Sequence, residues 1–163
     1  MIEMNTKILS KDQLVTRIKE IRSAGGRVGF TNGCFDILHL GHIRYLRKAG
    51  KECDVLVVGV NSDRSVRALK GAERPLNKEA ARAEVLAELA CVGLVAIFAE
   101  DTPIELIKAI MPDVLFKGGD WKEEDIVGSR EVKNSGGRVM VVSFEEGYST
   151  TGLISRLRSA EGK

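Results

Sequence analysis

Short aliphatic runs alternate with amphipathic segments along the chain, and this alternation restricts the folds that it can adopt. The clearest run is DVLVVGV at 54–60, which is continuous and rich in valine, as is typical of a strand buried on both faces of a parallel sheet. Four further runs predict strands, and they lie at 27–32, at 93–98, within 113–121 and within 136–144. Strands that alternate with helices form parallel sheets through right-handed crossovers. The pattern therefore predicts an α/β fold, a doubly wound five-stranded parallel sheet with helices on both faces.

Capping residues indicate where the predicted helices begin. Ser10 opens a capping box ahead of the first helix, which is expected over 10–24. Thr102 is the predicted N-cap of a later helix, with Pro103 at its first position and Glu105 completing a second capping box. The remaining helices are expected from the end of TNGCFDILHLGH to about 50, within 61–71, over 77–92 and from about 149 to about 159.

Length and hydrophobic content predict one domain over 1–163. A chain of 163 residues with 44% hydrophobic residues is long enough to bury a sizeable core. The first 26 residues are interpreted as an N-terminal helical extension of this domain. The helix over 77–92 has an apolar side, expected to contain Ala81, Val85, Leu86 and Leu89.

Charge and cysteine content argue against several classes of protein. The net charge of +2 is too small to predict a general nucleic-acid binder. The three cysteines lack a C-x-x-C spacing, which argues against a disulfide framework and a structural zinc site. No apolar run approaches the roughly 18 residues of a membrane helix. We therefore expect a cytoplasmic protein that binds neither nucleic acid nor membrane.

Polar clusters follow four of the five predicted strands. They are TNGCFDILHLGH after the first strand, NSD after the second, KGGDW after the fourth and EEGYSTT after the fifth. Ligands of parallel α/β sheets bind outside the carboxyl ends of the strands, where the strand order reverses. The four clusters together therefore predict a ligand site at this edge.

His39 and His42 are the only histidines of the chain, and both lie at the start of one predicted helix. Residues three apart on a helix lie on the same side, and the amides of a helix N-terminus attract anions. Gly33 and Gly41 would allow the backbone close to a ligand. This pattern favours phosphate binding, with metal binding and simple helix capping as the alternatives. It matches neither the dinucleotide fingerprint nor the P-loop.

The segment NGCFDILHLGH resembles the H-x-G-H signature of the nucleotidylyltransferase superfamily. These enzymes transfer a nucleoside monophosphate from a nucleoside triphosphate to a phosphate-bearing acceptor. The resemblance extends from about 27 to 157. It is strongest to the D-glycero-β-D-manno-heptose 1-phosphate adenylyltransferases, in VGVNSDRSVRALKG, ERPLNKEAARAEVL, EDTPIELIKAIMPDVLFKGGDW and GYSTTGLI. It implies a Rossmann-like sheet and the synthesis of ADP-heptose and pyrophosphate from ATP and heptose 1-phosphate, for lipopolysaccharide cores. It also implies Mg²⁺ held mainly by ATP, and a homodimer.

The same resemblance implies roles for individual residues. Three are expected to be catalytic: His39, His42 and Lys117. A larger set is expected to bind the nucleotide: Thr31, Asn32, Gly33, Phe35, Gly41, Arg82, Gly118, Asp120, Trp121, Tyr148, Ser149, Thr150 and Thr151. A third set is expected to bind the acceptor and its phosphate: Asn61, Asp63, Lys70 and Arg74.

Several of these roles have a structural alternative. Arg82 is expected either to contact the ligand or to form a surface ion pair. Asp63 would orient the sugar, help recruit Mg²⁺ or cap the following helix. Lys70 and Arg74 would lie in a loop that closes over the triphosphate, or in a solvated loop. Cys34, although inside the motif, is interpreted as a turn residue and not as a nucleophile.

Two other functions compete with the adenylyltransferase. A cytidylyltransferase acting on glycerol 3-phosphate or a similar acceptor is the first, but such enzymes usually carry Arg-Thr-Glu-Gly where this chain has Phe144-Glu145-Glu146-Gly147. The second is a non-catalytic nucleotide-binding module, for which loss of one of the two histidines would be the mark. Both histidines are present.

Overall fold

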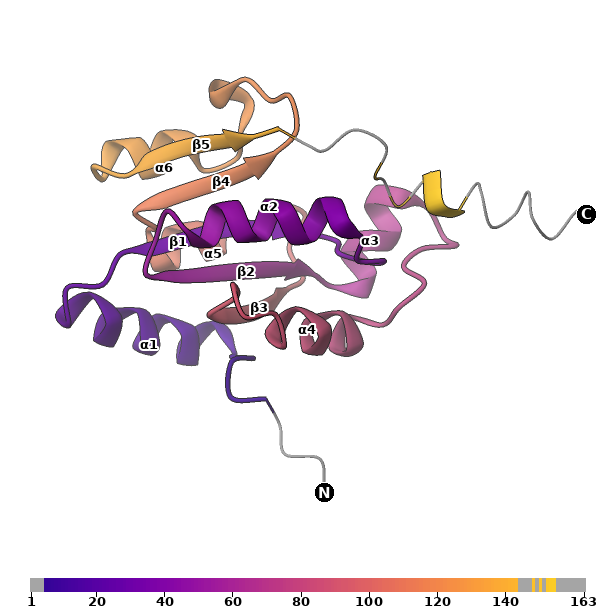
Figure 1. Cartoon of the computed structure of the whole chain (residues 1–163), viewed down its shortest axis with the longest axis horizontal. Helices are drawn as coiled ribbons and strands as arrows, with labels where there is room; N and C mark the ends of the chain where they lie inside the picture. The colour runs from indigo at the N-terminus through magenta and orange to yellow at the C-terminus, as the bar shows by residue number, and fades with distance from the viewer. Residues whose placement is uncertain (1–4, 144–147, 149, 151, 155–163) are drawn as a thin grey trace, which may run out of the picture.

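Five parallel strands form one sheet in the order β3-β2-β1-β4-β5 (Figure 1). The computed structural model describes residues 5–143, 148, 150 and 152–154. The strands are β1 (Val28–Gly33), β2 (Val55–Asn61), β3 (Leu94–Phe98), β4 (Val114–Gly118) and β5 (Arg138–Val142). All five lie within a residue or two of the predicted runs. The predicted doubly wound, Rossmann-like parallel sheet is confirmed.

Helices cover both faces of the sheet and enclose two hydrophobic clusters. They are α1 (Lys11–Ser23), α2 (Leu40–Gly50), α3 (Asp63–Lys70), α4 (Glu79–Ala87), α5 (Ile104–Ile110) and α6 (Ser129–Asn134), with a short 3-10 helix η1 (Glu123–Asp125). Buried residues of α1, α5 and α6 pack in one cluster with Phe30. Buried residues of α2 and α4 pack in the other with Phe116. The sheet is thus buried on both sides, as its aliphatic runs predict.

The sheet is divided between β1 and β4, where the strand order reverses. β1 pairs with β2 over six residue pairs, from Val28↔Val55 to Gly33↔Val60. It pairs with β4 only at Gly29↔Val114 and Phe30↔Leu115. Beyond those pairs the two strands continue without pairing to each other. We call this short junction the β1–β4 seam, and it lies where a ligand site is expected.

The N-terminal helix α1 packs into the core of the domain. The capping box is confirmed, because Ser10 accepts from the Gln13 amide and its own amide donates to Gln13. Leu14 and Ile18 are fully buried in the first cluster. The preceding residues also join the sheet, since Ile8 bridges Val95 of β3 in parallel.

Other helix predictions were wrong in detail. In α4, Ala81 and Val85 are exposed, whereas Arg82 and Ala83 are buried beside Leu86. Alanine-rich sequence leaves the inward face ambiguous, and the neighbouring strands decide it.

The N-terminus of α5 and the segment after β4 also differ from prediction. Pro103 is the N-cap of α5 and no side chain caps it, so the predicted Thr102–Glu105 capping box does not form. The sequence reading missed η1 and α6 altogether. Of the last predicted helix, Thr150 and 152–154 are helical and the rest lies outside the described residues.

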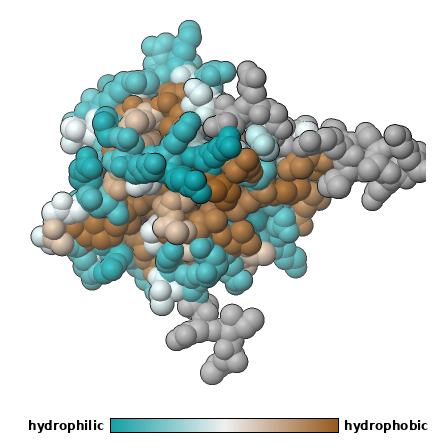
Figure 2. All heavy atoms as spheres, viewed as in Figure 1, coloured by the Kyte–Doolittle hydropathy of each residue, from teal (hydrophilic) through white to brown (hydrophobic). Residues whose placement is uncertain are grey.

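The surface divides into hydrophilic and hydrophobic regions. Figure 2 shows hydrophilic side chains over much of the face that carries α2, with hydrophobic surface toward the end of the molecule where α3 lies. Leu40, Leu69 and Leu76 are exposed large hydrophobic residues. Within the residues that the structure describes, no helix has the length and apolar character needed to cross a membrane.

Candidate active site

A cleft of about 610 Å³ opens at the carboxyl ends of β1, β2 and β4. Of the predicted site residues, eleven line it: Asn32, Gly33, Phe35, His42, Asn61, Lys70, Arg74, Lys117, Gly118, Trp121 and Thr150. Seven described ones are not among its lining residues: Thr31, His39, Gly41, Asp63, Arg82, Asp120 and Tyr148. Ser149 and Thr151 lie outside the described residues. All four predicted polar clusters therefore contribute residues to the cleft, and the contribution of the fourth cluster is Thr150.

His39 and His42 stack on one another at the start of α2. Their ring centroids are 3.9 Å apart with an interplanar angle of 27°. His39 is the N-cap residue, and its Nδ1 accepts a hydrogen bond of 3.4 Å from the His42 amide. A side chain at Gly41 would place a Cβ 3.0 Å from the His39 ring and 3.2 Å from Tyr148 Cβ. A side chain at position 41 would thus press on the His39 ring, and the capping interaction fixes the orientation of His39.

His42 carries a buried atom that lacks a partner. Its Nδ1 has no hydrogen bond within the described part of the chain, although buried polar atoms are nearly always paired. The Phe35 ring packs against its imidazole with centroids 5.4 Å apart. Burial and the adjacent His39 lower the pKa of His42 from 6.5 to about 4, and burial also lowers the pKa of His39. Both rings are therefore neutral near pH 7, and an anion in the cleft would favour their protonated forms.

The low pKa of His42 predicts a titration that NMR can follow directly. Because the chain has two histidines, an untagged sample should give two imidazole Hε1 resonances, which His42→Gln assigns. We expect one midpoint near pH 4 and the other somewhat below 6.5. The folded state then holds fewer protons than the unfolded chain between these values, so the free energy of unfolding should decrease as pH falls through that window. His42→Gln should reduce this decrease. Two midpoints at or above 6.5 would contradict the burial of the pair.

Lys117 and Trp121 form the opposite wall, at the end of β4. The Lys117 Nζ lies 5.3 Å from the centre of the Trp121 ring, and half of the Trp121 surface is exposed. Burial lowers the pKa of the Lys117 ammonium, as expected for a cation that has no carboxylate partner among the described residues. Gly118 ends the strand beside it, whereas Asp120 is exposed and is not one of the lining residues. This wall combines a cation with an aromatic ring that a base or sugar can contact.

Asp36 is a residue that the sequence reasoning missed. Its carboxylate is buried and accepts hydrogen bonds from Arg74 Nε at 2.6 Å, from the Leu76 amide at 2.9 Å and from the Asn77 amide at 2.8 Å. Burial alone would raise its pKa, but these donors outweigh burial and hold the pKa below 3.8. Arg74 is therefore an ion-pair partner of Asp36 and not a free loop cation. The loop that was expected to close over a ligand is tied to the segment after β1.

Arg82 is buried and joins three loops behind the cleft. Its guanidinium donates to the backbone oxygens of Cys34, Asn61 and Asn77, the latter two at 2.7 Å and 2.9 Å. It also donates to Asp63 Oδ1 at 2.9 Å. Arg82 does form an ion pair, with Asp63, but the prediction that this pair lies on the surface is wrong, because the Arg82 side chain is buried. The guanidinium supports the cleft from behind and is not one of its lining groups.

Three other residues have contacts that bear on their expected roles. Ser62, not Asp63, caps α3. Thr31 is buried with its hydroxyl 2.6 Å from that of Tyr45, and it is not one of the lining residues. Cys34 lines the cleft, but burial raises the pKa of its thiol. A protonated thiol is a poor nucleophile, which supports its interpretation as a turn residue.

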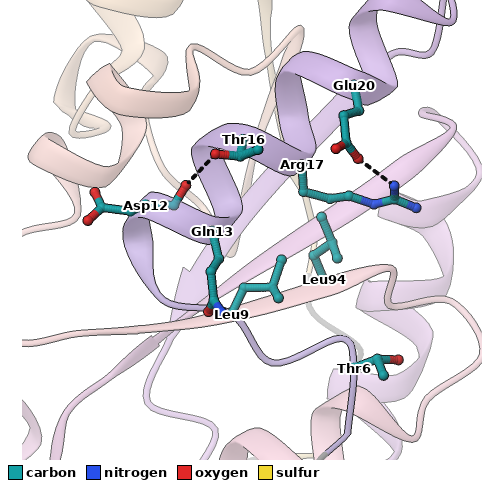
Figure 3. Close-up of a pocket in the computed structure, with 8 residues that line it drawn as sticks. All are labelled: Thr6, Leu9, Asp12, Gln13, Thr16, Arg17, Glu20 and Leu94. Atoms are coloured by element: carbon teal, nitrogen blue, oxygen red, sulfur yellow. Dashed lines mark hydrogen bonds and ion pairs between the residues drawn. The ribbon is translucent and has the colours of Figure 1, made fainter.

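A second hollow of about 420 Å³ lies away from these residues, along α1. Figure 3 shows Arg17 paired with Glu20, and Thr16 bonded to the Asp12 carbonyl oxygen. Both of these contacts are made within α1 itself. Within the described residues, no group of three His, Cys, Asp or Glu side chains could hold a metal ion. The cleft at the sheet edge is the better candidate.

Comparison with protein families and curated proteins gives consistent matches. The family model described as cytidylyltransferase-like matches residues 30–156. Bifunctional protein HldE of Acidiphilium cryptum (strain JF-5) is 54% identical over 153 residues, which are 94% of this chain and 32% of that protein. HldE of Geotalea uraniireducens (strain Rf4) is 52% identical over 161 residues, 99% of this chain and 33% of that protein. The chain thus spans about a third of the length of these relatives.

Solved structures agree with these matches. The lipopolysaccharide core biosynthesis protein from Thermoplasma volcanium GSS1 is 30% identical, with a TM-score of 0.62, and the match covers 77% of this chain and all of that one. Pantoate-beta-alanine ligase from Francisella tularensis, solved in complex with beta-gamma ATP and beta-alanine, has a TM-score of 0.57 at 15% identity. The match covers 85% of this chain and 67% of the ligase chain. This second likeness concerns the fold alone.

Proposed function

This chain belongs to the cytidylyltransferase-like family, and from that premise we propose that it transfers AMP from ATP to D-glycero-β-D-manno-heptose 1-phosphate. The products are ADP-heptose and pyrophosphate. The observation that carries the proposal is the stacked histidine pair at the start of α2, where the Nδ1 of the cleft-lining His42 has no partner among the described residues. The similarity to the HldE proteins and to a lipopolysaccharide core biosynthesis protein supports the choice of acceptor.

The proposed reaction is a displacement at the α-phosphorus of ATP. An oxygen of the heptose 1-phosphate forms a bond to that phosphorus, and the bond to the bridging oxygen of the β-phosphate breaks, so pyrophosphate carries away the electron pair. Negative charge builds on the phosphate oxygens during this exchange. His39, His42 and Lys117 would stabilise it by hydrogen bonds and charge, and such positioned donors supply most of the catalysis in phosphoryl-type transfers.

Magnesium would reach the site as part of the substrate. Mg²⁺ prefers phosphate oxygens and water to a cage of protein ligands. Two described carboxylates near the cleft are already engaged, because Asp36 is bonded to Arg74 and backbone amides and Asp63 is bonded to Arg82. We therefore propose that the chain binds the magnesium complex of ATP and holds the metal chiefly through the nucleotide.

A cytidylyltransferase acting on glycerol 3-phosphate or a similar acceptor is the second candidate. The name of the matching family model favours it. Against it stands the sequence FEEG at 144–147, where Arg-Thr-Glu-Gly is usual in such enzymes. The base is therefore the part of the proposal that most needs a direct measurement.

Pyrophosphate release distinguishes the two candidates. The four nucleoside triphosphates are each combined with heptose 1-phosphate, glycerol 3-phosphate and phosphopantetheine, with Mg²⁺ present. We expect turnover with ATP and heptose 1-phosphate, and mass spectrometry should identify ADP-heptose. Turnover with CTP and glycerol 3-phosphate alone would establish the second candidate. ATP binding without pyrophosphate release for any acceptor would favour a non-catalytic module.

Location and assembly belong to the same proposal. Both substrates are charged metabolites of the cell interior, so we propose that the protein acts in the cytoplasm. We also propose a homodimer, which sedimentation equilibrium tests: a mass near 17.8 kDa at micromolar concentration would contradict it.

A further inference from the structure

The connection between β3 and α5 contributes two polar side chains to the cleft, and for one of them, Thr102, the sequence predicted a helix-capping role. Asp101, Thr102 and Pro103 all line the cleft. The Asp101 and Thr102 residues are exposed, and Pro103 is buried. Because α5 begins at Ile104 without a side-chain cap, neither polar side chain has a role at the helix terminus. Within the described part of the chain, neither has a hydrogen-bond or ion-pair partner.

Among the described residues that line the cleft, Asp101 is the carboxylate without a hydrogen-bond or ion-pair partner. Asp36 is the other carboxylate among the lining residues, but its side chain is 1% exposed and its oxygens accept from Arg74 and two amides. Asp63, for which orienting the sugar was one of three expected roles, is not a lining residue and is bonded to Arg82. The carboxylate available to a ligand is therefore Asp101, after β3, and not Asp63, after β2.

The position of Asp101 fits the acceptor better than the nucleotide phosphates. β3 and β2 lie on one side of β1, and β4 lies on the other, so Asp101 and Lys117 come from opposite halves of the sheet. Lys70, at the end of α3, also lines the cleft. A carboxylate repels phosphate but accepts strong hydrogen bonds from neutral hydroxyl groups, whereas an ammonium attracts phosphate. This half of the cleft therefore offers separate contacts for the two parts of a sugar phosphate.

We propose that Asp101 and Thr102 bind hydroxyl groups of the acceptor sugar while Lys70 faces its phosphate, so that the cleft selects a polyhydroxylated sugar phosphate. The inference rests on the proposed function and adds to it the residues that determine the acceptor. Asp101 accepts hydrogen bonds from the sugar, and the Thr102 hydroxyl donates or accepts one beside it. Neither residue takes part in the bond-making step.

Steady-state kinetics of Asp101→Asn test the proposal. We expect the KM for heptose 1-phosphate to rise at least about tenfold, since hydrogen bonds to a charged group are the stronger ones, while the KM for ATP stays within twofold. Thr102→Ala should raise the same KM severalfold. The matched control is Glu100→Gln, because Glu100 is the adjacent exposed carboxylate, accepts from the Ala99 amide and is not a lining residue. Thermal unfolding of all three variants should match the wild type.

Singly deoxygenated heptose 1-phosphates make the test specific. For the analogue that lacks the bound hydroxyl, wild type and Asp101→Asn should have the same KM. If Asp101→Asn leaves the KM for heptose 1-phosphate unchanged, or raises the KM for ATP equally, the inference is wrong although the proposed function stands. If the wild type neither binds nor uses heptose 1-phosphate, the proposed function itself fails, and the inference fails with it.

Discussion

Replacing His39 or His42 by alanine is expected to lower the turnover number by about 10²–10³ each, the usual effect of removing one donor that stabilises transition-state charge. The stack of the two rings, with centroids 3.9 Å apart, makes them one unit, so the double variant should lose less than the product of the two effects. Pyrophosphate release at saturating ATP and heptose 1-phosphate measures the loss.

Two further His39 variants separate its capping role from its proposed contact with phosphate. Asparagine can replace the Nδ1 acceptor that receives the His42 amide but does not reach as far as Nε2. Glutamine reaches toward the Nε2 position but is a poor cap. We expect His39→Asn to retain the stability of α2, which a lost cap would reduce by about 1 kcal/mol, and still to lose most activity. Full activity in His39→Asn would show that His39 acts only as a cap.

Replacing Arg82 by alanine is expected to lower the free energy of unfolding by about 3–5 kcal/mol, the usual cost of breaking a buried ion pair. Arg82 is 3% exposed. Its loss would leave the Asp63 carboxylate and the carbonyl oxygens of Cys34, Asn61 and Asn77 without a donor. Urea denaturation followed by circular dichroism measures the change.

Arg17 offers a matched control for Arg82. It pairs with Glu20 at 2.7 Å, but both side chains are 57% exposed (Figure 3). Exposed pairs of this kind contribute little, so Arg17→Ala should change the free energy of unfolding by about 0.5 kcal/mol or less. Arg82→Lys, which keeps the charge but has fewer donors, should fall between the two alanine variants. Equal effects at 17 and 82 would contradict the assignment of Arg82 as the buried junction of three loops.

The sequence predicted the sheet well because its strands are short aliphatic runs buried on both faces. The same reasoning failed for α4, where alanines surround the helix and Val85 lies on the exposed side. It also missed α6, a six-residue helix, because a single turn or two gives no readable period. Local pattern thus identifies elements with strong periodicity, and packing decides the rest.

The candidate site was predicted only in part, for a physical reason. The two histidines and the glycine between them form a local motif, and their stacking follows from spacing on one helix turn. The burial of Asp36 and Arg82 depends on partners about 40 to 50 residues away, such as Leu76 and Cys34. Nothing near either residue in the sequence signals those partners, so both look like ordinary charged residues until the fold is known.

The β1–β4 seam also bears on how the chain reaches its native state. Of the four strand pairings, that of Gly29 with Val114 joins the residues most distant along the chain, and it has the fewest residue pairs. Loop-closure entropy grows with that distance, and contacts between distant residues slow folding. Among the four strand pairings, the cleft therefore lies at the one whose closure has the highest entropic cost and which gains the fewest paired residues. A ligand that contacts both Gly33 and Gly118 would link the ends of β1 and β4. Its binding would therefore stabilise the strand pairing that has the fewest residue pairs.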